Sequence, residues 1–443
     1  MPSSSRSSFV NGSPPDAGGT TAGGALERGT VVTVTCGPMV HGGLCLSRLD
    51  DGTTVFVAGG IPDEVVHARL DYSKRRSWFA TVLDAMEGSP HRVKPPCPAV
   101  PDCGGCQLQH VTYAHQLHLK REIVLDALRH AKVDVPDIVV HGMEHPWAYR
   151  WRGEFHVVPG AAGLADAELG FNRARSWTPI AVDDCLIHHR SIGDQLPVLR
   201  ELVRTAGRRG LTTLHLTVGE DGRELLIRPN PRHGLDPAIV DDLAVRDGRL
   251  WSTDSTTLRW RDHVFRITPD TFIQVNWAGL EILYGIVLDA VGALDGLRIV
   301  DAYAGIGVLP VVMASGGAEV VCIESNPASV QMGLLNARLN GVEDRVQYVG
   351  ADVADALPSV CRGEIDTLLL DPPRAGCGGV VTGWLALAGP ERVIYVSCDP
   401  ATLARDLKIL VSSGPYVVER FDLVDMFPQT YHVESVAVLR RRP

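Results

Sequence analysis

The sequence predicts an α/β fold: a doubly wound, mostly parallel sheet in the C-terminal part, preceded by a small β-barrel and an α+β domain. Three observations predict it. Short alternating apolar and polar runs end in glycine turns near the N-terminus, and mixed strand-like pieces surround one expected helix in the middle. From about residue 266, apolar strands alternate with helix-length segments, which is typical of a parallel sheet covered on both faces.

Length, composition and charge narrow the class of protein. The chain has 443 residues, 45% of them apolar, so we expect two or three domains. Its formal net charge of −10 gives no overall attraction for a polyanion, and a nucleic-acid site would depend on local clusters such as "KRRSW" at 74–78. Because no signal-peptide core or membrane-length apolar run is present, we expect a soluble cytoplasmic protein. In that compartment the ten cysteines should be thiols or metal ligands.

The N-terminal part is expected to contain a leader and a barrel. Residues 1–27 consist mainly of Ser, Gly, Pro and Thr with almost nothing to bury, which predicts a disordered leader. In residues 28–88, period-two runs such as "TVVTVTCG" and "SWFATVLDAM" are separated by Asp-Gly and Gly-Gly turns. Such short runs predict a small antiparallel barrel.

Residues 89–265 are expected to form a central α+β domain. It opens with a loop rich in Pro, Gly and Cys at 89–110, followed by a helix at about 113–130. Strand-like pieces such as "EFHVVPG" and "TLHLTVG" then surround a second helix at 192–206.

Four cysteines of this domain are candidate metal ligands. Cys97, Cys103 and Cys106 have the spacing C-x5-C-x2-C, and Cys185 is a distant fourth candidate. Thiolates on a flexible loop bind zinc or an iron–sulfur cluster, and the spacing alone does not separate the two.

Residues 266–443 place polar residues where successive strands end. "VDAYAGIGVLP" puts Asp301 at a strand end and Gly305 and Gly307 in the turn that opens a helix. Glu324 ends the next strand, where a carboxylate can accept hydrogen bonds from a ribose diol, and Asp352 ends the third. Since ligands of doubly wound sheets bind beyond the carboxyl ends of the strands, we expect a cofactor site there.

The glycines alone fit a dinucleotide, S-adenosylmethionine, or a tight turn without ligand. A nicotinamide cofactor favours a third glycine, and Pro310 stands at that position, so S-adenosylmethionine is favoured. "LLLDPPRAG" ends the fourth strand with Asp371 before two prolines, a rigid turn suited to holding a planar base.

Cys398 in "RVIYVSCDPATLARDL" lies between a buried strand and a helix. The helix N-terminus and Arg405 on that helix should favour the thiolate, whereas a packing role is the alternative for a buried cysteine. Beside a methyl donor, a thiolate could add to C6 of uracil and make C5 nucleophilic. A base must then remove the C5 proton. His432 and Glu434 in "DMFPQTYHVESVAVL" are candidates, and Glu434 is preferred because burial at a strand entrance can raise its pKa.

These motifs resemble the S-adenosylmethionine-dependent RNA 5-methyluridine methyltransferases that carry a TRAM domain and an iron–sulfur cluster. The resemblance runs from about Gly29 to the C-terminus. "SCDPATLARDL" is similar to the nucleophile motif of the family and "DMFPQTYHVE" to its base motif, while "FIQVN" at 272–276 and "DAYAGIGVL" are similar to cofactor-contacting motifs.

The resemblance implies roles for individual residues. Cys398 would be the nucleophile and Glu434 the base. The implied cofactor-binding residues are Gln274, Tyr303, Val308, Glu324, Asp352 and Asp371. Three loop cysteines with a remote fourth match the cluster site of the family, which favours a 4Fe-4S cluster over zinc on Cys97, Cys103, Cys106 and Cys185.

The resemblance also implies an architecture and a function. Residues 28–88 would be a TRAM barrel of the OB-like kind, and residues 266–443 a Rossmann-like class I methyltransferase domain. The expected enzyme is a monomer that forms 5-methyluridine in RNA through a Cys–C6 adduct. The barrel and cluster favour 23S rRNA; a tRNA 5-methyluridine methyltransferase and a non-catalytic RNA-binding or assembly protein are the alternatives.

RNA contacts are expected in the barrel and in the central domain. Single strands bind such barrels through aromatic stacking and basic grooves. The candidates are Phe56, Tyr72, Trp78, Phe79, Arg69, Lys74, Arg75 and Arg76 in the barrel, and Arg150, Arg152, Arg173 and Arg175 in the central domain. The target uridine would have to flip out of the RNA stack.

Overall fold

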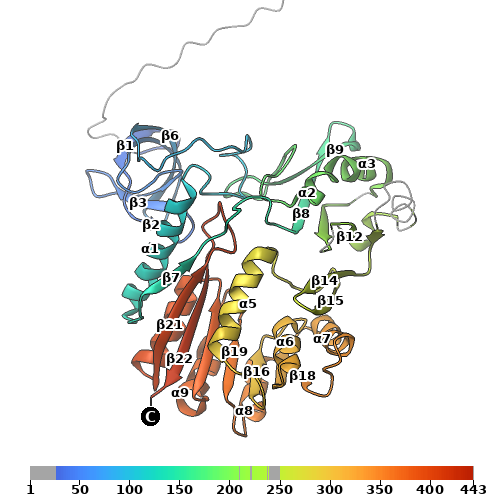
Figure 1. Cartoon of the computed structure of the whole chain (residues 1–443). Helices are drawn as coiled ribbons and strands as arrows, with labels where there is room; N and C mark the ends of the chain where they lie inside the picture. Colours follow the sequence, from blue (N-terminus) through green and yellow to red (C-terminus); the bar gives the residue numbers. More distant parts are fainter. Residues whose placement is uncertain (1–25, 209, 220–221, 237, 239–249, 443) are drawn as a thin grey trace, which may run out of the picture. The chain divides into compact units, whose positions relative to one another are not determined.

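The structure is a computed structural model that describes residues 26–442 except 209, 220–221, 237 and 239–249 (Figure 1). It divides into two compact units. The first contains the chain up to Pro38 together with Cys45–Ser89, and the second contains Met39–Leu44 and Pro90–Pro443. Most of the leader predicted at 1–27 lies outside the described residues.

The first unit is built on one sheet in which β1, β5, β6, β4 and β3 are neighbours in that order. Its strands are β1 (Val31–Thr35), β3 (Leu44–Arg48), β4 (Thr54–Ala58), β5 (Val65–Lys74) and β6 (Ser77–Glu87). The β1–β5 and β5–β6 pairs are antiparallel, as expected. The expectation of a wholly antiparallel sheet is wrong for β4 and β6, which pair in parallel because β5 intervenes between them in the chain.

Three of the aromatic residues proposed to contact RNA stack on one another in this sheet. The ring centroids of Phe56 and Phe79 are 5.1 Å apart, and those of Tyr72 and Phe79 are 4.7 Å apart. The strand register explains the stack, because it pairs Phe79 with Phe56 on one side and with Tyr72 on the other. Tyr72 remains exposed, so part of the stack faces solvent.

The second unit begins with β2 (Met39–Val40) and contains a six-stranded sheet in the order β10-β9-β8-β11-β12-β13. These strands are β8 (Arg152–Gly160), β9 (Gly163–Asn172), β10 (Pro179–Ala181), β11 (Thr213–Val218), β12 (Glu224–Asn230) and β13 (Leu250–Ser252). The short helix α2 (Arg190–Gly193) precedes α3 (Leu196–Ala206), whose Leu199, Leu202 and Val203 pack into the core of this sheet. The hairpin β14 (Thr256–Trp260) and β15 (His263–Ile267) follows.

A second, eight-stranded sheet has the order β18-β17-β16-β19-β20-β22-β21-β7. Its strands are β16 (Arg298–Ala302), β17 (Glu319–Glu324), β18 (Val346–Gly350), β19 (Thr367–Leu370), β20 (Arg392–Ser397), β21 (Tyr416–Val424), β22 (Glu434–Arg441) and β7 (Ile138–His141). The first five strands are parallel, and β22 is antiparallel to both β20 and β21. β7, from much earlier in the chain, lies beside β21 (Figure 1).

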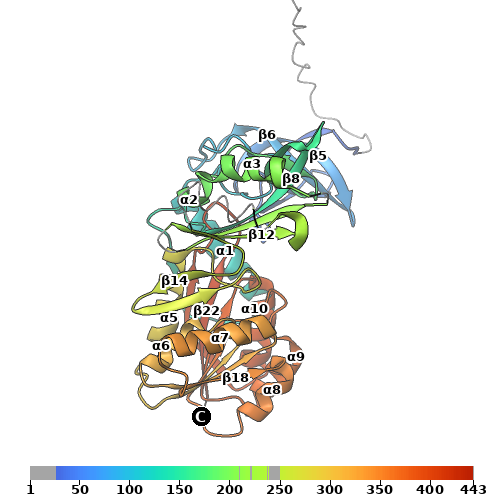
Figure 2. The same cartoon turned by 90° about the vertical axis from the view of Figure 1, so that its right-hand side faces the viewer.

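Helices cover both faces of the eight-stranded sheet, as predicted for buried parallel strands (Figure 2). One layer contains α5 (Trp277–Val291), α6 (Val308–Ser315) and α7 (Pro327–Leu339). The other contains α1 (Tyr113–Ala131), α8 (Val353–Val360), α9 (Gly378–Ala388) and α10 (Pro400–Leu407). Alternate strand residues such as Ile299 and Val300 face the two layers in turn. Within the described residues, we find no helix that combines the length and the apolar character needed to cross a membrane.

A fully buried ion pair joins α1 to the segment between β21 and β22. Lys120 Nζ lies 2.6 Å from Asp425 Oδ1, and both side chains are 0% exposed. Lys120 also donates a hydrogen bond to the carbonyl of Phe427, and the hydroxyl of Tyr113 donates one to Asp425 Oδ2. This network anchors the start of the segment that leads to Glu434.

Replacing Lys120 with Met should lower the free energy of unfolding by about 3–5 kcal/mol, because it leaves the Asp425 carboxylate buried without its cation. Urea denaturation measures the loss. Arg121→Met is the matched control, since it removes a partly exposed ion pair with Glu122 from the same helix and should cost at most about 1 kcal/mol. Equal denaturation midpoints for the two variants would contradict the argument.

Candidate active site

Cys398 and Glu434 lie at the ends of two neighbouring antiparallel strands. Cys398 directly follows β20, and Glu434 is the first residue of β22. The register pairs Ser397 with Ser435, so one further step along the ladder sets Cys398 opposite Glu434. Since opposite residues of antiparallel strands have Cα atoms about 4.5–5.5 Å apart, this topology brings the thiol and the carboxyl group together.

The surroundings of Cys398 hold its thiol in the protonated form. Burial, followed by the charges of Glu434 and Asp371, raises the pKa of Cys398 to about 11, while Arg374 acts in the opposite direction. The expectation that Arg405 would favour the thiolate is not met. Arg405 instead pairs with Asp406 at 2.8 Å and donates a hydrogen bond to the carbonyl of Ala375.

Glu434 is a buried acid of the site, with 4% of its surface exposed. Burial and the nearby Asp371 raise its pKa well above the ordinary range of a glutamate, although Arg374 opposes the shift. The expectation of a raised pKa for this carboxyl group is therefore confirmed. The other candidate base, His432, has its pKa lowered to about 3 by burial and by Arg374, so its ring is neutral near pH 7.

A cavity lies at the carboxyl ends of β16 and β19. It is lined by Tyr303, Val308 and Asp371, three of the predicted cofactor-binding residues, and by Phe272, Tyr284 and Asp301. Tyr303 and Gly305 have positive φ angles, 72° and 55°, so the chain turns sharply there before α6. Burial raises the pKa of Asp371 to about 7.

Glu324, Asp352 and Gln274 are not among the residues that line this cavity. Glu324 braces the cavity wall, because its carboxylate accepts hydrogen bonds from the amides of Gly305 at 2.9 Å and Asn326 at 2.7 Å. Asp352 is exposed and caps α8 by accepting a hydrogen bond from the amide of Ala354. Gln274 is buried one residue beyond Ile273, which does line the cavity.

The structure adds residues that the sequence did not single out. His41 Nε2 lies 3.7 Å from Asp399 Oδ2, and its ring meets that of Tyr431 edge to face at 5.1 Å. Arg374 influences the titration of both Cys398 and Glu434. The "DPPR" sequence at the end of β19 could have pointed to Arg374, but no local pattern connects His41 with Asp399, which is so distant in the chain.

The segment between β21 and β22 is held by the loop that follows the cysteines. The amides of Gln107 and Leu108 donate hydrogen bonds to the carbonyl of Gln429, at 3.0 and 2.9 Å. Gln116 of α1 donates to Gln429 Oε1 and accepts a hydrogen bond from the Gln429 amide. The position of the chain segment that leads to Glu434 therefore depends on the position of the cysteine loop.

All four predicted ligand cysteines line a single cavity of about 200 Å³. Burial raises the pKa of Cys106 to about 12, with smaller contributions from Cys185, Cys103 and Cys97, so the four thiols influence one another. The amide of Gly105 donates a hydrogen bond to Cys103 Sγ at 3.4 Å. Among the described residues, however, no group of three or more His, Cys, Asp or Glu could hold a metal ion as it stands.

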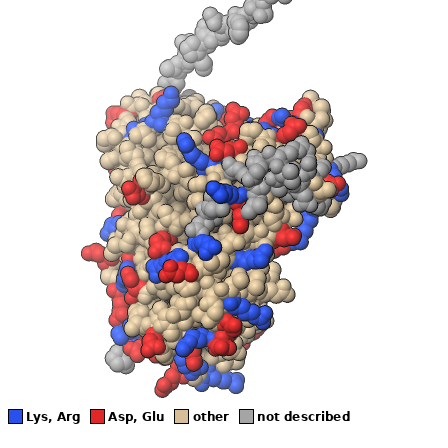
Figure 3. All heavy atoms as spheres, turned by 45° about the vertical axis from the view of Figure 1, so that its right-hand side comes forward, with Lys and Arg blue, Asp and Glu red and all other residues tan. Residues whose placement is uncertain are grey.

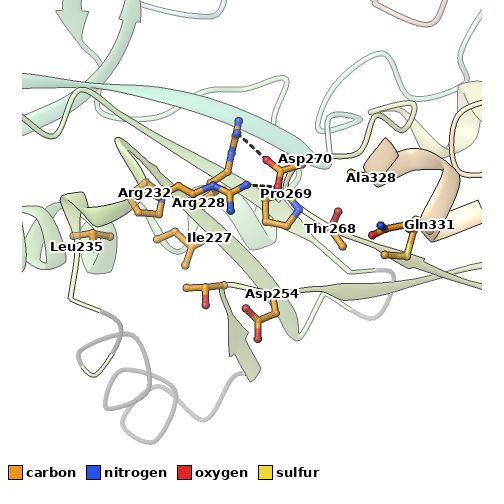
Figure 4. A pocket seen from close by; sticks show the side chains of 13 residues that line it. Ile227, Arg228, Arg232, Leu235, Asp254, Thr268, Pro269, Asp270, Ala328 and Gln331 are labelled. Carbon is orange, nitrogen blue, oxygen red and sulfur yellow. Dashed lines mark hydrogen bonds and ion pairs between the residues drawn. The ribbon is translucent and has the colours of Figure 1, made fainter. Parts of the chain in front are cut away.

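A separate cavity of about 460 Å³ contains none of the predicted catalytic or cofactor-binding residues (Figure 4). Its basic residues Arg228 and Arg232 both pair with Asp270. Because Asp270 already neutralises part of the charge of these guanidinium groups, we expect the cavity to bind anions more weakly than two unpaired arginines would.

The doubly wound sheet has a glycine turn after its first strand and acids after the following ones, which is a Rossmann-like arrangement that binds ligands beyond the carboxyl ends of the strands. The sequence model of the tRNA (Uracil-5-)-methyltransferase family matches residues 251–442. An RNA methyltransferase of Gloeobacter violaceus is 35% identical, over 94% of this chain and 98% of its own length. The chain belongs to the RNA uracil-5 methyltransferase family.

Two further relatives extend the comparison. The 23S rRNA (uracil(1939)-C(5))-methyltransferase RlmD of Dichelobacter nodosus is 33% identical, over 88% of this chain and 94% of its own. The crystal structure of the tRNA (uracil-54, C5)-methyltransferase of Pyrococcus abyssi with S-adenosyl-L-homocysteine covers 92% of this chain and 100% of its own. It superposes with a TM-score of 0.70 at 22% identity, which establishes a shared fold.

Proposed function

We propose that the protein converts uridine to 5-methyluridine in RNA and that 23S rRNA is its substrate. The arrangement of Cys398 opposite Glu434, next to the cavity at the ends of β16 and β19, carries this proposal. The 33% identity to a 23S rRNA methyltransferase supports the choice of rRNA over tRNA. A non-catalytic RNA-binding protein would have no use for a half-buried thiol beside a buried acid.

The proposed reaction begins with the thiolate of Cys398, which forms a bond to C6 of the uracil while the C5–C6 π electrons move to C5 and O4 as an enolate. S-adenosylmethionine would supply the electrophilic methyl group, and its transfer to C5 would leave neutral S-adenosylhomocysteine, whose sulfur keeps the electron pair of the broken C–S bond. Glu434 then removes the C5 proton. The electrons of that C–H bond restore the C5–C6 double bond and expel the thiolate, so the free cysteine is regenerated.

The resting protonation states require a trigger, because the pKa of Cys398 is about 11 and that of Glu434 is raised. Arg374 already lowers the pKa of both groups. A cationic ligand in the cavity beside Asp371 would act in the same direction, since a nearby positive charge favours thiolate and carboxylate. The nucleophile would thus become active when the methyl donor is in place.

The proposed cofactor site consists of residues that line the cavity at the ends of β16 and β19 and of Glu324, which is hydrogen-bonded to its wall. Tyr303, Val308 and Asp371 line it, and Glu324 holds the Gly305 turn with a carboxylate that retains lone pairs for a ribose diol. Asp352 and Gln274 do not line the cavity, but they are proposed contacts of the cofactor because the charge of Asp352 raises the pKa of the lining residue Tyr303, and Gln274 directly follows Ile273 of the lining.

The sheet of the first unit is proposed to be a TRAM barrel that binds RNA. Its Phe56–Phe79–Tyr72 stack supports this role, because aromatic faces stack with unpaired bases. Acidic and basic side chains are interspersed on the face drawn in Figure 3. Binding of a polyanion would therefore rely on local clusters such as Lys74, Arg75 and Arg76 rather than on the overall charge.

The four cysteines are proposed to hold a 4Fe-4S cluster with a structural role. Their common cavity and the amide hydrogen bond to Cys103 fit cluster thiolates, which often accept such bonds. The spacing C-x5-C-x2-C with a remote fourth cysteine favours a cluster over zinc, whose sites more often contain two close C-x2-C pairs. When bound, the cluster would supply a cross-link between the loop and Cys185.

Cys106→Ala should therefore lose most of its iron and acid-labile sulfide when purified without oxygen. Both are measured per chain by colorimetric assay. Cys361→Ala, which removes another partly buried thiol at the end of α8, should keep the wild-type content. Stoichiometric zinc in the wild type, or full iron in the Cys106 variant, would refute the cluster.

Nucleoside mass spectrometry of rRNA and tRNA from a strain lacking the gene tests the function itself. We expect 5-methyluridine to disappear from one position of 23S rRNA and to return on complementation. Loss from tRNA alone would favour the tRNA alternative. Unchanged 5-methyluridine in both RNAs would reject the assignment.

A further inference from the structure

A solvent-exposed tryptophan stands at the rim of a groove in the central sheet. Trp177 is 92% exposed and lies in the turn between β9 and β10. The groove measures about 560 Å³, and its walls include Trp177, Arg173, Arg175, Asn172, His156 and Gly104. Pockets that hold ligands of nucleotide size typically measure about 300–1,000 Å³.

The turn that carries Trp177 is well ordered by its own hydrogen bonds. The Arg173 amide donates to the carbonyl of Thr178, and the Thr178 amide donates to the Ser176 hydroxyl. The turn is also fixed to the cysteine loop, because the amides of Ala174 and Gly104 bond to the carbonyls of Asp102 and Asn172 respectively. The backbone of the turn is therefore fixed before a partner binds, and only the Trp177 side chain has to lose conformational freedom.

The chemistry of the groove matches a nucleotide. Trp177 offers an open aromatic face, and two arginines stand on the same turn. Arg173 pairs with Asp102 at 2.8 Å, but both side chains are exposed, so the pair is weak and a phosphate could compete for the guanidinium. Asn172 Oδ1 is buried without a hydrogen-bond partner in the described structure, and it could accept a bond from a base N–H.

We infer that this groove binds one nucleotide of a single-stranded segment of the substrate RNA, with its base stacked on Trp177. Arg173 and Arg175 face the phosphates, and Asn172 contacts the base edge. The inference rests on the proposed function, and it assigns to the central domain a part in substrate binding that is separate from the reaction at Cys398.

Fluorescence anisotropy with a short, labelled, uridine-containing single-stranded RNA tests the inference. Trp177→Ala should weaken binding about tenfold, which is the scale of one lost base–aromatic stack, while Trp177→Phe should retain most of the affinity. Leu387→Ala is the matched control: Leu387 is 83% exposed at the far end of α9, and its loss should change nothing. In methylation assays the Ala variant should show a raised KM for RNA with kcat unchanged.

Three outcomes separate the inference from the function on which it rests. Wild-type affinity in Trp177→Ala, in a protein that methylates RNA, would overturn the groove alone. Weaker binding by this variant, in a protein that forms no 5-methyluridine, would reject the function and retain the groove. An equal loss for a duplex of the same sequence would overturn the single-strand assignment, because paired bases cannot stack on Trp177.

Discussion

Cys398→Ala is expected to abolish 5-methyluridine formation and covalent attachment to RNA, while the variant still binds RNA and cofactor. The physical reason is that C5 of uracil is too electron-poor to attack a methyl donor unless a nucleophile first adds to C6. Loss of a covalent catalyst leaves no alternative route, so turnover should fall below detection. Transfer of tritium-labelled methyl groups to RNA measures turnover, and isothermal titration calorimetry measures cofactor binding.

The matched control for this substitution is again Cys361→Ala, which deletes a partly buried thiol at the C-terminal end of α8 and should leave kcat unchanged. Residual turnover in Cys398→Ala at more than a small fraction of the wild-type rate would show that the thiol is not the nucleophile.

Glu434→Gln is expected to stop the reaction one step later. The amide cannot accept the C5 proton, so the methylated adduct should persist as a covalent protein–RNA product. Because burial already favours the neutral form of Glu434, the isosteric neutral amide should leave the fold nearly unchanged. Denaturing gels run with and without heating would show a slower band that contains both RNA and a transferred methyl group.

Glu419→Gln serves as the control, since Glu419 is an exposed acid on the adjacent strand β21. That variant should turn over normally and leave no adduct. If Glu434→Gln also turned over normally, a different group would have to be the base, and Asp371, whose charge raises the pKa of Glu434, would be the next acid to test.

Much of the fold could be predicted because its signals are local. Buried strands such as "TLLL" and "RVIYVS" are recognisable from their continuous apolar residues. The turn after β16 is recognisable from its glycines. The place of β7 beside β21 could not be predicted, since pairing between such distant segments leaves no local pattern. The parallel pairing of β4 with β6 could not be predicted for the same reason.

The candidate site was predictable in its members but not in its electrostatics. Cys398 and Glu434 stand in distinctive motifs, and parallel topology places Asp371 near them. The sequence pointed to Arg405 as the activating cation, although that guanidinium is held by Asp406. Charge effects depend on which side chains share a space, and the approach of Arg374 and His41 follows only from tertiary packing.

The carbonyl of Gln429 receives two amides from the stretch directly after the last loop cysteine. If oxygen damaged the cysteine loop, the turn at Gln429 would lose these two hydrogen bonds, and this turn precedes the proposed base Glu434. Because the same loop also holds the turn that carries Trp177, loss of the proposed cluster in air should both slow the breakdown of the covalent adduct and weaken RNA binding.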